Sequence, residues 1–191
     1  MPTLNGSETE KHLLAAFAGE SQARSRYTIA AKIAKKEGYE QISGIFMETA
    51  ENELEHAKMF FKQLQGGEAT ITAGYPAGVV GDTLAQLKAA AEGEKLEWTT
   101  LYTNSSDVAK QEGFDEIADV FNHIAEVEQW HERRYNKLIE AVANGTVFKA
   151  PSPALWKCRN CGRVHEGTEP PDICPSCLHP KAHFELYVEN Y

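Results

Sequence analysis

An internal repeat constrains the fold of this chain more than any other feature. Residues 34–56, AKKEGYEQISGIFMETAENELEH, resemble residues 109–131, AKQEGFDEIADVFNHIAEVEQWH, at an offset of 75 positions. The offset aligns Gly38 with Gly113 and His56 with His131, so the match includes a rare residue type and two glycines suited to ending helices. We therefore expect two copies of one helical pair within the first 145 residues.

Four long helices are predicted from this repeat. Ser7 and Glu10 have the spacing of a capping box, so the first helix is expected to begin there and to end at Gly38. The second is expected over residues 39–67, the third from the N-cap Asp82 to Gly113, and the fourth over residues 114–145. Residues 67–81, GEATITAGYPAGVVG, are predicted to form a loop. The predicted fold class is an all-α four-helix bundle.

The composition changes after residue 148. Residues 149–154, KAPSPA, are predicted to link a bundle domain of residues 1–148 to a small domain of residues 155–191. All four cysteines lie in this second domain. Close pairing of cysteines, in a chain expected to occupy a reducing compartment, favours a metal site over disulfides.

The cysteines form two Cys-x-x-Cys pairs separated by twelve residues. Cys158 and Cys161 make the first pair, and Cys174 and Cys177 make the second. Two such knuckles predict a tetrahedral four-thiolate metal site, which accepts either iron or zinc. Zinc there would be structural, whereas iron could carry one electron.

Net charge and the absence of apolar segments exclude several partners. The formal charge is −9, which argues against a nucleic-acid partner. Residues 1–19 have no basic segment followed by an apolar run, so no secretion signal is expected. No segment is long and apolar enough to cross a membrane, so we expect a cytoplasmic protein with no membrane partner.

Two apolar stripes at helical spacing contain glutamate and histidine. Glu53 and His56 interrupt the stripe between residues 42 and 60, and Glu128 and His131 interrupt the stripe between residues 117 and 138. The Glu-x-x-His spacing places both side chains on one helical face, toward the core. A buried carboxylate must be neutralised or paired, because burying a bare charge is very costly.

The other two helices supply further carboxylates. Glu20 lies on the inner face of the first, and Glu94 and Glu97 lie three residues apart in the third. Arg24 is the only clear inward-facing base, so metal cations are the expected neutralising charges. One Glu from each of two helices plus Glu-x-x-His from the other two is the ligand set of ferritin-like di-metal proteins. Carboxylate with imidazole suits iron or manganese, and a metal-free ion-pair network is the alternative.

Two tyrosines are duplicated together with these candidate ligands. Tyr27 and Tyr102 pair at the offset of 75, and both are expected near the metal layer. They could be plain core aromatics, but their duplication favours hydroxyl groups that donate to the carboxylate ligands.

The repeat contains one irregularity in the third helix. Glu20 aligns with Glu94, and Gly19 with Gly93, at an offset of 74 rather than 75, so one extra residue lies between Glu94 and Tyr102. On a regular helix that residue would rotate Tyr102 by about 100° away from the metals. A single π-helical turn containing Glu97 would absorb it, and such turns are common at functional sites. A regular helix with Tyr102 turned away is the alternative.

These motifs together resemble the rubrerythrin family over essentially the whole chain. Gly162 after Cys161 and Pro175 after Cys174 are similar to rubredoxin knuckles, whereas Leu178 stands where a glycine is usual. The resemblance implies a ferritin-like bundle with a rubredoxin-like domain. The bundle residues that carry it are Glu20, Glu53, His56, Glu94, Glu97, Glu128 and His131.

The resemblance implies a non-haem peroxidase that reduces hydrogen peroxide to water in oxidative-stress protection. It implies two iron ions in the bundle, one iron in the four-cysteine site, and an exchange of Glu97 and His56 at one iron; Tyr27 and Tyr102 would complete the catalytic set. It also implies a homodimer, head-to-tail, supplied with electrons by an external rubredoxin or NAD(P)H-dependent reductase. The chain has no Gly-x-Gly-x-x-Gly fingerprint, so it is not expected to bind that nicotinamide itself.

Two other functions are compatible with parts of the sequence. A ferroxidase or iron-storage protein would need the bundle alone, and the four-cysteine domain argues against it. A non-catalytic adaptor would carry zinc in a ribbon. Colour distinguishes this adaptor from a protein with iron in the four-cysteine site, because an iron–thiolate site makes the protein red.

Overall fold

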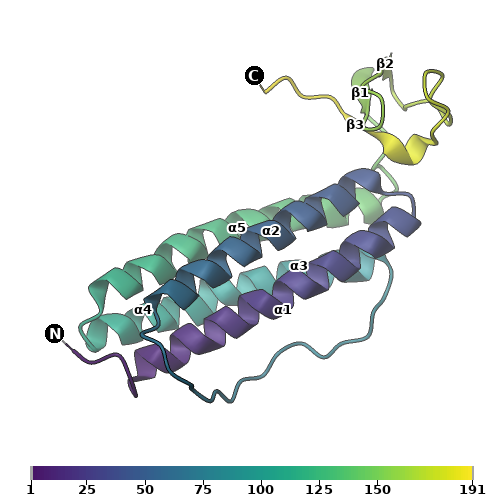
Figure 1. Cartoon of the computed structure of the whole chain (residues 1–191). Coiled ribbons are helices and arrows are strands. Elements are labelled where there is room, and N and C mark those ends of the chain that lie inside the picture. The colour runs from purple at the N-terminus through teal and green to yellow at the C-terminus, as the bar shows by residue number, and fades with distance from the viewer. Residues whose placement is uncertain (1, 191) are drawn as a thin grey trace.

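Helices packed side by side form the larger part of the computed structural model, which describes residues 2–190 (Figure 1). Helix α1 spans Glu8–Lys36, α2 spans Glu40–Gln63 and α5 spans Asp115–Ala143. The remaining helical rod consists of α3 (Thr83–Leu96), the π-helix η1 (Glu97–Leu101) and α4 (Tyr102–Gln111). The predicted four-helix architecture is confirmed.

The helix ends follow the sequence signals, with one exception. Ser7 Oγ accepts from the backbone N–H of Glu10, whose carboxylate accepts from Gly6 N–H. Asp82 accepts from Ala85 N–H at the start of α3. The exception is α2, which ends at Gln63 rather than at residues 66–67, because Leu64 already has an extended backbone (φ −73°, ψ 145°).

The irregular third rod contains the predicted π-helical turn. Residues Glu97–Leu101 form a π-helix, and the backbone N–H of Tyr102 donates to the carbonyl of Glu97, five residues back. The extra residue of the repeat is absorbed here, and the alternative of an unbroken α-helix is wrong. Tyr102 consequently faces the bundle interior, where it is 2% exposed.

Two apolar clusters lie on either side of the polar layer along the bundle. One contains Tyr27, Phe46 and Tyr135, with ring centroids 5.4–6.1 Å apart. The other contains Phe60, Tyr102 and Phe121, with centroids 4.9–6.0 Å apart. Each buried aromatic side chain contributes about 2 kcal/mol by removal from water, so the two clusters hold the polar layer between them in place.

Residues 64–82 form a long connection that crosses the outside of the bundle from the end of α2 to the start of α3 (Figure 1). Its middle is attached to α1, because the Tyr75 hydroxyl donates to the carbonyl of Ala15 at 2.8 Å. Among the described residues, none of the helices has the length and apolar character that crossing a membrane requires.

The C-terminal part is a three-stranded antiparallel sheet of order β2-β1-β3. Its strands are β1 (Ala154–Cys158), β2 (Val164–Gly167) and β3 (Phe184–Leu186). The short 3₁₀ helix η2 (Lys181–His183) immediately precedes β3. It packs on the first turns of α2: a methyl group added at Gly44 would lie 2.7 Å from Arg159 Nη2. The domain boundaries at residues 148 and 155 stay a prediction.

Candidate metal centres

Two groups of buried side chains meet in the polar layer of the bundle. The first group is Glu20, Glu53, His56 and Glu128, and the second is Glu53, Glu94, Glu128 and His131. Within each group, one ligand-type atom per residue lies within 4.8 Å of all the others. Because Glu53 and Glu128 belong to both groups, the two candidate sites are adjacent and share two carboxylates.

The distances at the histidines follow the repeat. Nδ1 of His56 lies 2.8 Å from Glu53 and 2.8 Å from Glu128, and Nδ1 of His131 lies 2.8 Å from Glu128 and 3.4 Å from Glu53. Glu20 lies 3.7 Å from the first ring nitrogen and Glu94 lies 3.8 Å from the second. The arrangement therefore has approximate twofold symmetry.

The polar atoms of this layer are buried and lack hydrogen-bond partners. Among residues 2–190, both carboxylate oxygens of Glu53 and Glu128 and Nδ1 of His56 and His131 have no hydrogen bond of acceptable geometry. In each group these ligand atoms nevertheless lie within 4.8 Å of one another. Buried polar groups are rarely left unpaired, so these residues fit two bound cations.

The charges of the layer explain the direction of its pKa shifts. Burial raises the pKa of Glu20 well above its usual value, and it raises the pKa of Glu94 to about 8. Burial also opposes the charged form of Glu53, but the adjacent side chains of His131 and His56 favour it and lower its pKa to about 2. The neighbouring carboxylates overcome the burial of His56 and His131, and raise their pKa values to about 9 and about 12. The layer therefore favours bound positive charge.

The duplicated tyrosines hold the outer carboxylates. Tyr27 donates to Glu94, and Tyr102 donates to Glu20. Burial raises the pKa of both hydroxyl groups well above the usual value, so both keep their protons. The expectation that these hydroxyls lie beside the candidate ligands fits this geometry, while their catalytic role stays a prediction.

Glu97 and Arg24 lie elsewhere than the rest of the predicted set. Glu97 is half-buried on η1, outside both four-residue groups, and burial beside Glu94 raises its pKa well above the usual value. Arg24 does not face the layer: its half-exposed guanidinium lies 3.7 Å from Glu51, so its prediction as an inward-facing base was wrong. Long basic side chains keep their charge in water where they can.

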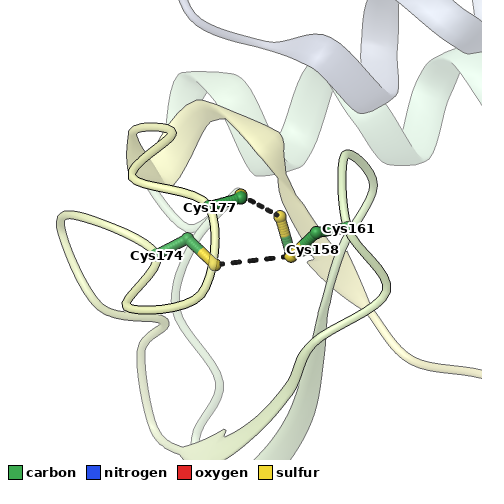
Figure 2. Close-up of side chains that lie close together, drawn as sticks. All are labelled: Cys158, Cys161, Cys174 and Cys177. Atoms are coloured by element: carbon green, nitrogen blue, oxygen red, sulfur yellow. Dashed lines mark hydrogen bonds between the residues drawn. The ribbon is translucent and has the colours of Figure 1, made fainter.

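The four cysteines converge in the C-terminal part (Figure 2). The Sγ atoms of Cys158 and Cys177 lie 3.8 Å apart, those of Cys161 and Cys174 lie 3.7 Å apart, and all four thiols are free. A tetrahedron with metal–sulfur bonds of about 2.3 Å has sulfur–sulfur edges of about 3.8 Å. The four thiolates therefore fit one metal ion.

The two cysteine knuckles have the same backbone form although their sequences differ. Gly162 N–H donates to the carbonyl of Cys158, and Leu178 N–H donates to the carbonyl of Cys174, both at 2.8 Å. Gly162 has φ 78° and Leu178 has φ 60°, so leucine occupies a left-handed conformation that favours glycine. The departure noted in the sequence therefore leaves this backbone hydrogen bond intact.

A helical bundle with two overlapping carboxylate–histidine groups, followed by a four-thiolate knuckle domain, defines a di-metal carboxylate protein with a rubredoxin-like domain. The rubrerythrin family model matches residues 11–139, and the model of the rubrerythrin rubredoxin-like domain matches residues 156–185. The chain belongs to the rubrerythrin family, and it carries a di-iron carboxylate site in the bundle and a four-cysteine rubredoxin-like site.

Similar proteins cover nearly the whole chain. A rubrerythrin of Porphyromonas gingivalis is 57% identical over 189 residues, which is 99% of this chain and 94% of that protein. A rubrerythrin of Nitratidesulfovibrio vulgaris is 51% identical over 191 residues, all of both chains. A solved structure of fully reduced, all-ferrous nigerythrin has a TM-score of 0.64 at 31% identity, and covers 95% of this chain and 87% of its own.

Proposed function

We propose that this protein is a peroxidase that reduces hydrogen peroxide to water, with two electrons and two protons consumed for each peroxide. Rubrerythrins are generally oxidoreductases, which supports the reaction class. The observation that carries the proposal is the sharing of Glu53 and Glu128 between two adjacent ligand groups. Two ferrous ions bound there would supply both electrons together, so that the O–O bond breaks without release of a one-electron product.

The bundle residues are assigned roles within this proposal. One iron would be held by Glu20, Glu53, His56 and Glu128, and the other by Glu53, Glu94, Glu128 and His131. Tyr27 and Tyr102 fix two of the carboxylates by donating to them. Glu97 and Tyr102 both line a cavity of about 350 Å³ beside the site.

Glu97 is suited to move because it lies on the π-helix. A π-turn interrupts the α-helical hydrogen-bond ladder, and such turns occur frequently at functional sites. We propose that Glu97 exchanges with His56 at one metal as the site cycles between redox states. The half-buried position of Glu97, outside both ligand groups, supports this role.

Electrons would return singly through iron in the four-cysteine site. The C-terminal sheet lies beyond the end of the bundle where α2 begins (Figure 1), whereas Glu53 lies thirteen residues along α2 from Glu40. Thirteen residues of helix span about 20 Å, a long distance for transfer within one chain. A head-to-tail homodimer would shorten it, with an external rubredoxin or NAD(P)H-dependent reductase as donor. Four free thiols placed for a metal support a reducing, cytoplasmic setting.

Protein purified without oxygen tests the proposal. We expect about three iron ions per chain, a red colour from the four-cysteine site, and peroxide consumption when a reductase and reduced nicotinamide are supplied. The double variant Glu53→Ala/Glu128→Ala should remain red and lose this activity. A protein that oxidises ferrous ions with dioxygen but leaves peroxide intact would be a ferroxidase, and a colourless protein with zinc would be an adaptor.

A further inference from the structure

The cavity beside the di-metal layer lies between α1 and the third helical rod, under the connection of residues 64–82. Its volume is about 350 Å³, within the range of small-molecule sites. Tyr102 lies at its buried end, and Tyr75 of the connection is 37% exposed at its outer side. The cavity therefore extends from the surface to Tyr102, whose hydroxyl group donates to the candidate ligand Glu20.

Two glycines give the cavity its depth. A methyl group added at Gly19 would lie 3.7 Å from the ring of Tyr75, and one added at Gly93 would lie 3.8 Å from the guanidinium of Arg26. Each glycine immediately precedes a candidate ligand, Glu20 or Glu94. The cavity thus reaches the backbone beside both outer carboxylates, where any larger side chain would narrow it.

Tyr75 covers this space from outside. Its ring lies over Gly19, and its hydroxyl donates to the carbonyl of Ala15 at 2.8 Å. Pro76 follows, which holds the backbone at Tyr75 in an extended form and limits the directions of the ring. This single hydrogen bond is exposed to water, which can replace it, so little opposes movement of the ring away from its place.

We propose that this cavity is the route by which a hydroperoxide reaches Glu97 and Tyr102, and that Tyr75 is the lid that limits the size of hydroperoxide admitted. The inference rests on the proposed peroxidase function. Hydrogen peroxide has two heavy atoms and passes beside the ring. A bulky hydroperoxide ROOH, reduced with two electrons and two protons to ROH and water, reaches the same groups only when the ring swings out.

Discrimination between two substrates tests the lid. In Tyr75→Ala, kcat/KM for cumene hydroperoxide relative to that for hydrogen peroxide should rise about tenfold, since the steric barrier is removed. Tyr75→Phe keeps the ring, and should stay within about twofold of the wild-type ratio. Val79→Ala is the matched control, because Val79 lies in the same connection and is 95% exposed.

Amide hydrogen exchange provides a readout that does not depend on activity. In Tyr75→Ala, exchange should quicken in residues 68–82 and in the π-helical residues 97–101, and in Val79→Ala it should not quicken at 97–101. An unchanged substrate ratio in Tyr75→Ala would overturn Tyr75 as the limit on substrate size, and unchanged exchange at 97–101 would overturn it as the cover of this cavity. A wild-type protein that reduces no hydroperoxide would contradict the proposed function instead, and the exchange data would still decide whether Tyr75 closes the cavity.

Discussion

The hydroxyl group of Tyr102 donates a hydrogen bond to Glu20, which joins residues from different copies of the internal repeat. Tyr27 donates to Glu94, so each tyrosine bonds a glutamate of the other copy. Exchanging the two copies of the repeat also converts one four-residue ligand group into the other. Glu97 breaks this symmetry, because the positions 75 and 74 residues earlier hold Gln22 and Ala23, neither of which has a carboxylate. The cavity lies on the side of Glu97, so the two metals would differ in what reaches them.

Tyr27 and Tyr102 should differ in function, although each donates one equivalent hydrogen bond to a glutamate. Tyr102 lines the cavity and Tyr27 does not, so Tyr102→Phe should slow peroxide reduction by the pre-reduced protein about tenfold, whereas Tyr27→Phe should change it less than about twofold. Each variant should lose about 1 kcal/mol of stability, because each removes one buried hydrogen bond. Stopped-flow absorbance and thermal denaturation measure the two effects. Equal slowing in both variants would argue against access through this cavity.

The number of metals that a variant retains should depend on whether the removed carboxylate belongs to one ligand group or to both. Glu53→Ala and Glu128→Ala each remove a member of both groups, so each variant should lose both bundle metals and keep about one iron, at the four-cysteine site. Glu20→Ala and Glu94→Ala each affect one group, and should keep about two irons in total. Metal analysis of the four variants checks this order. Retention of both bundle metals in Glu53→Ala would exclude a bridging role for that residue.

Local signals in the sequence were sufficient for most of the fold. Capping at Ser7 and Asp82 and the helix-ending glycines at 38 and 113 act within a few residues, so their effects can be predicted from neighbours alone. The π-helix was also predictable, because the repeat supplied an internal reference for the spacing between Glu94 and Tyr102.

Contacts between distant segments were not predictable from the sequence. Tyr75 lies in a glycine-rich connection without periodicity, so nothing in its neighbours indicates that its ring covers Gly19. The prediction for Arg24 was wrong because periodicity locates the inner face of a helix only approximately. A long basic side chain near the edge of that face directs its charged end into water. The packing of Arg159 on Gly44 likewise depends on how two parts of the chain meet.

Removing the π-turn should slow the redox cycle without loss of metal. Deletion of Thr100, an exposed residue of η1, restores the seven-residue spacing found between Glu20 and Tyr27 and allows a regular helix. We expect both bundle metals to remain in this variant and in Glu97→Ala. Turnover should fall about tenfold in each, because the first loses the interrupted helical ladder at Glu97 and the second loses its carboxylate. Metal analysis and steady-state peroxide assays test this. Wild-type turnover in both variants would remove Glu97 and its turn from the mechanism.

The metal-free protein should lose stability as the pH rises from 6.5 to 9. His56 and His131 have pKa values raised from 6.5 to about 9 and about 12, so the folded state binds more protons than the unfolded state in this range. The pKa of Glu94 is raised from 4.5 to about 8, so this carboxyl group also makes the folded state less stable as the pH rises between these values. The contribution of Glu53 is lost only below pH 4.5, as the pH falls toward 2.

Thermal unfolding followed by helical circular dichroism measures this dependence. The metal-free protein should melt at a lower temperature at pH 9 than at pH 6.5. The metal-loaded protein should show a smaller difference, because bound cations replace the protons on the imidazoles. A metal-free protein that is more stable at pH 9 would contradict the assigned charge states.

The division of labour between the two metal sites is tested most directly by the double variant Cys158→Ser/Cys174→Ser. Both thiols are buried at the candidate four-cysteine site, so the variant should lose that metal, and the bundle should keep its own two. With a reductase and reduced nicotinamide, steady-state peroxide reduction should cease. The pre-reduced variant should still consume about one hydrogen peroxide per bundle site, because two metals hold two electrons. Multiple turnovers at the wild-type rate would contradict the account.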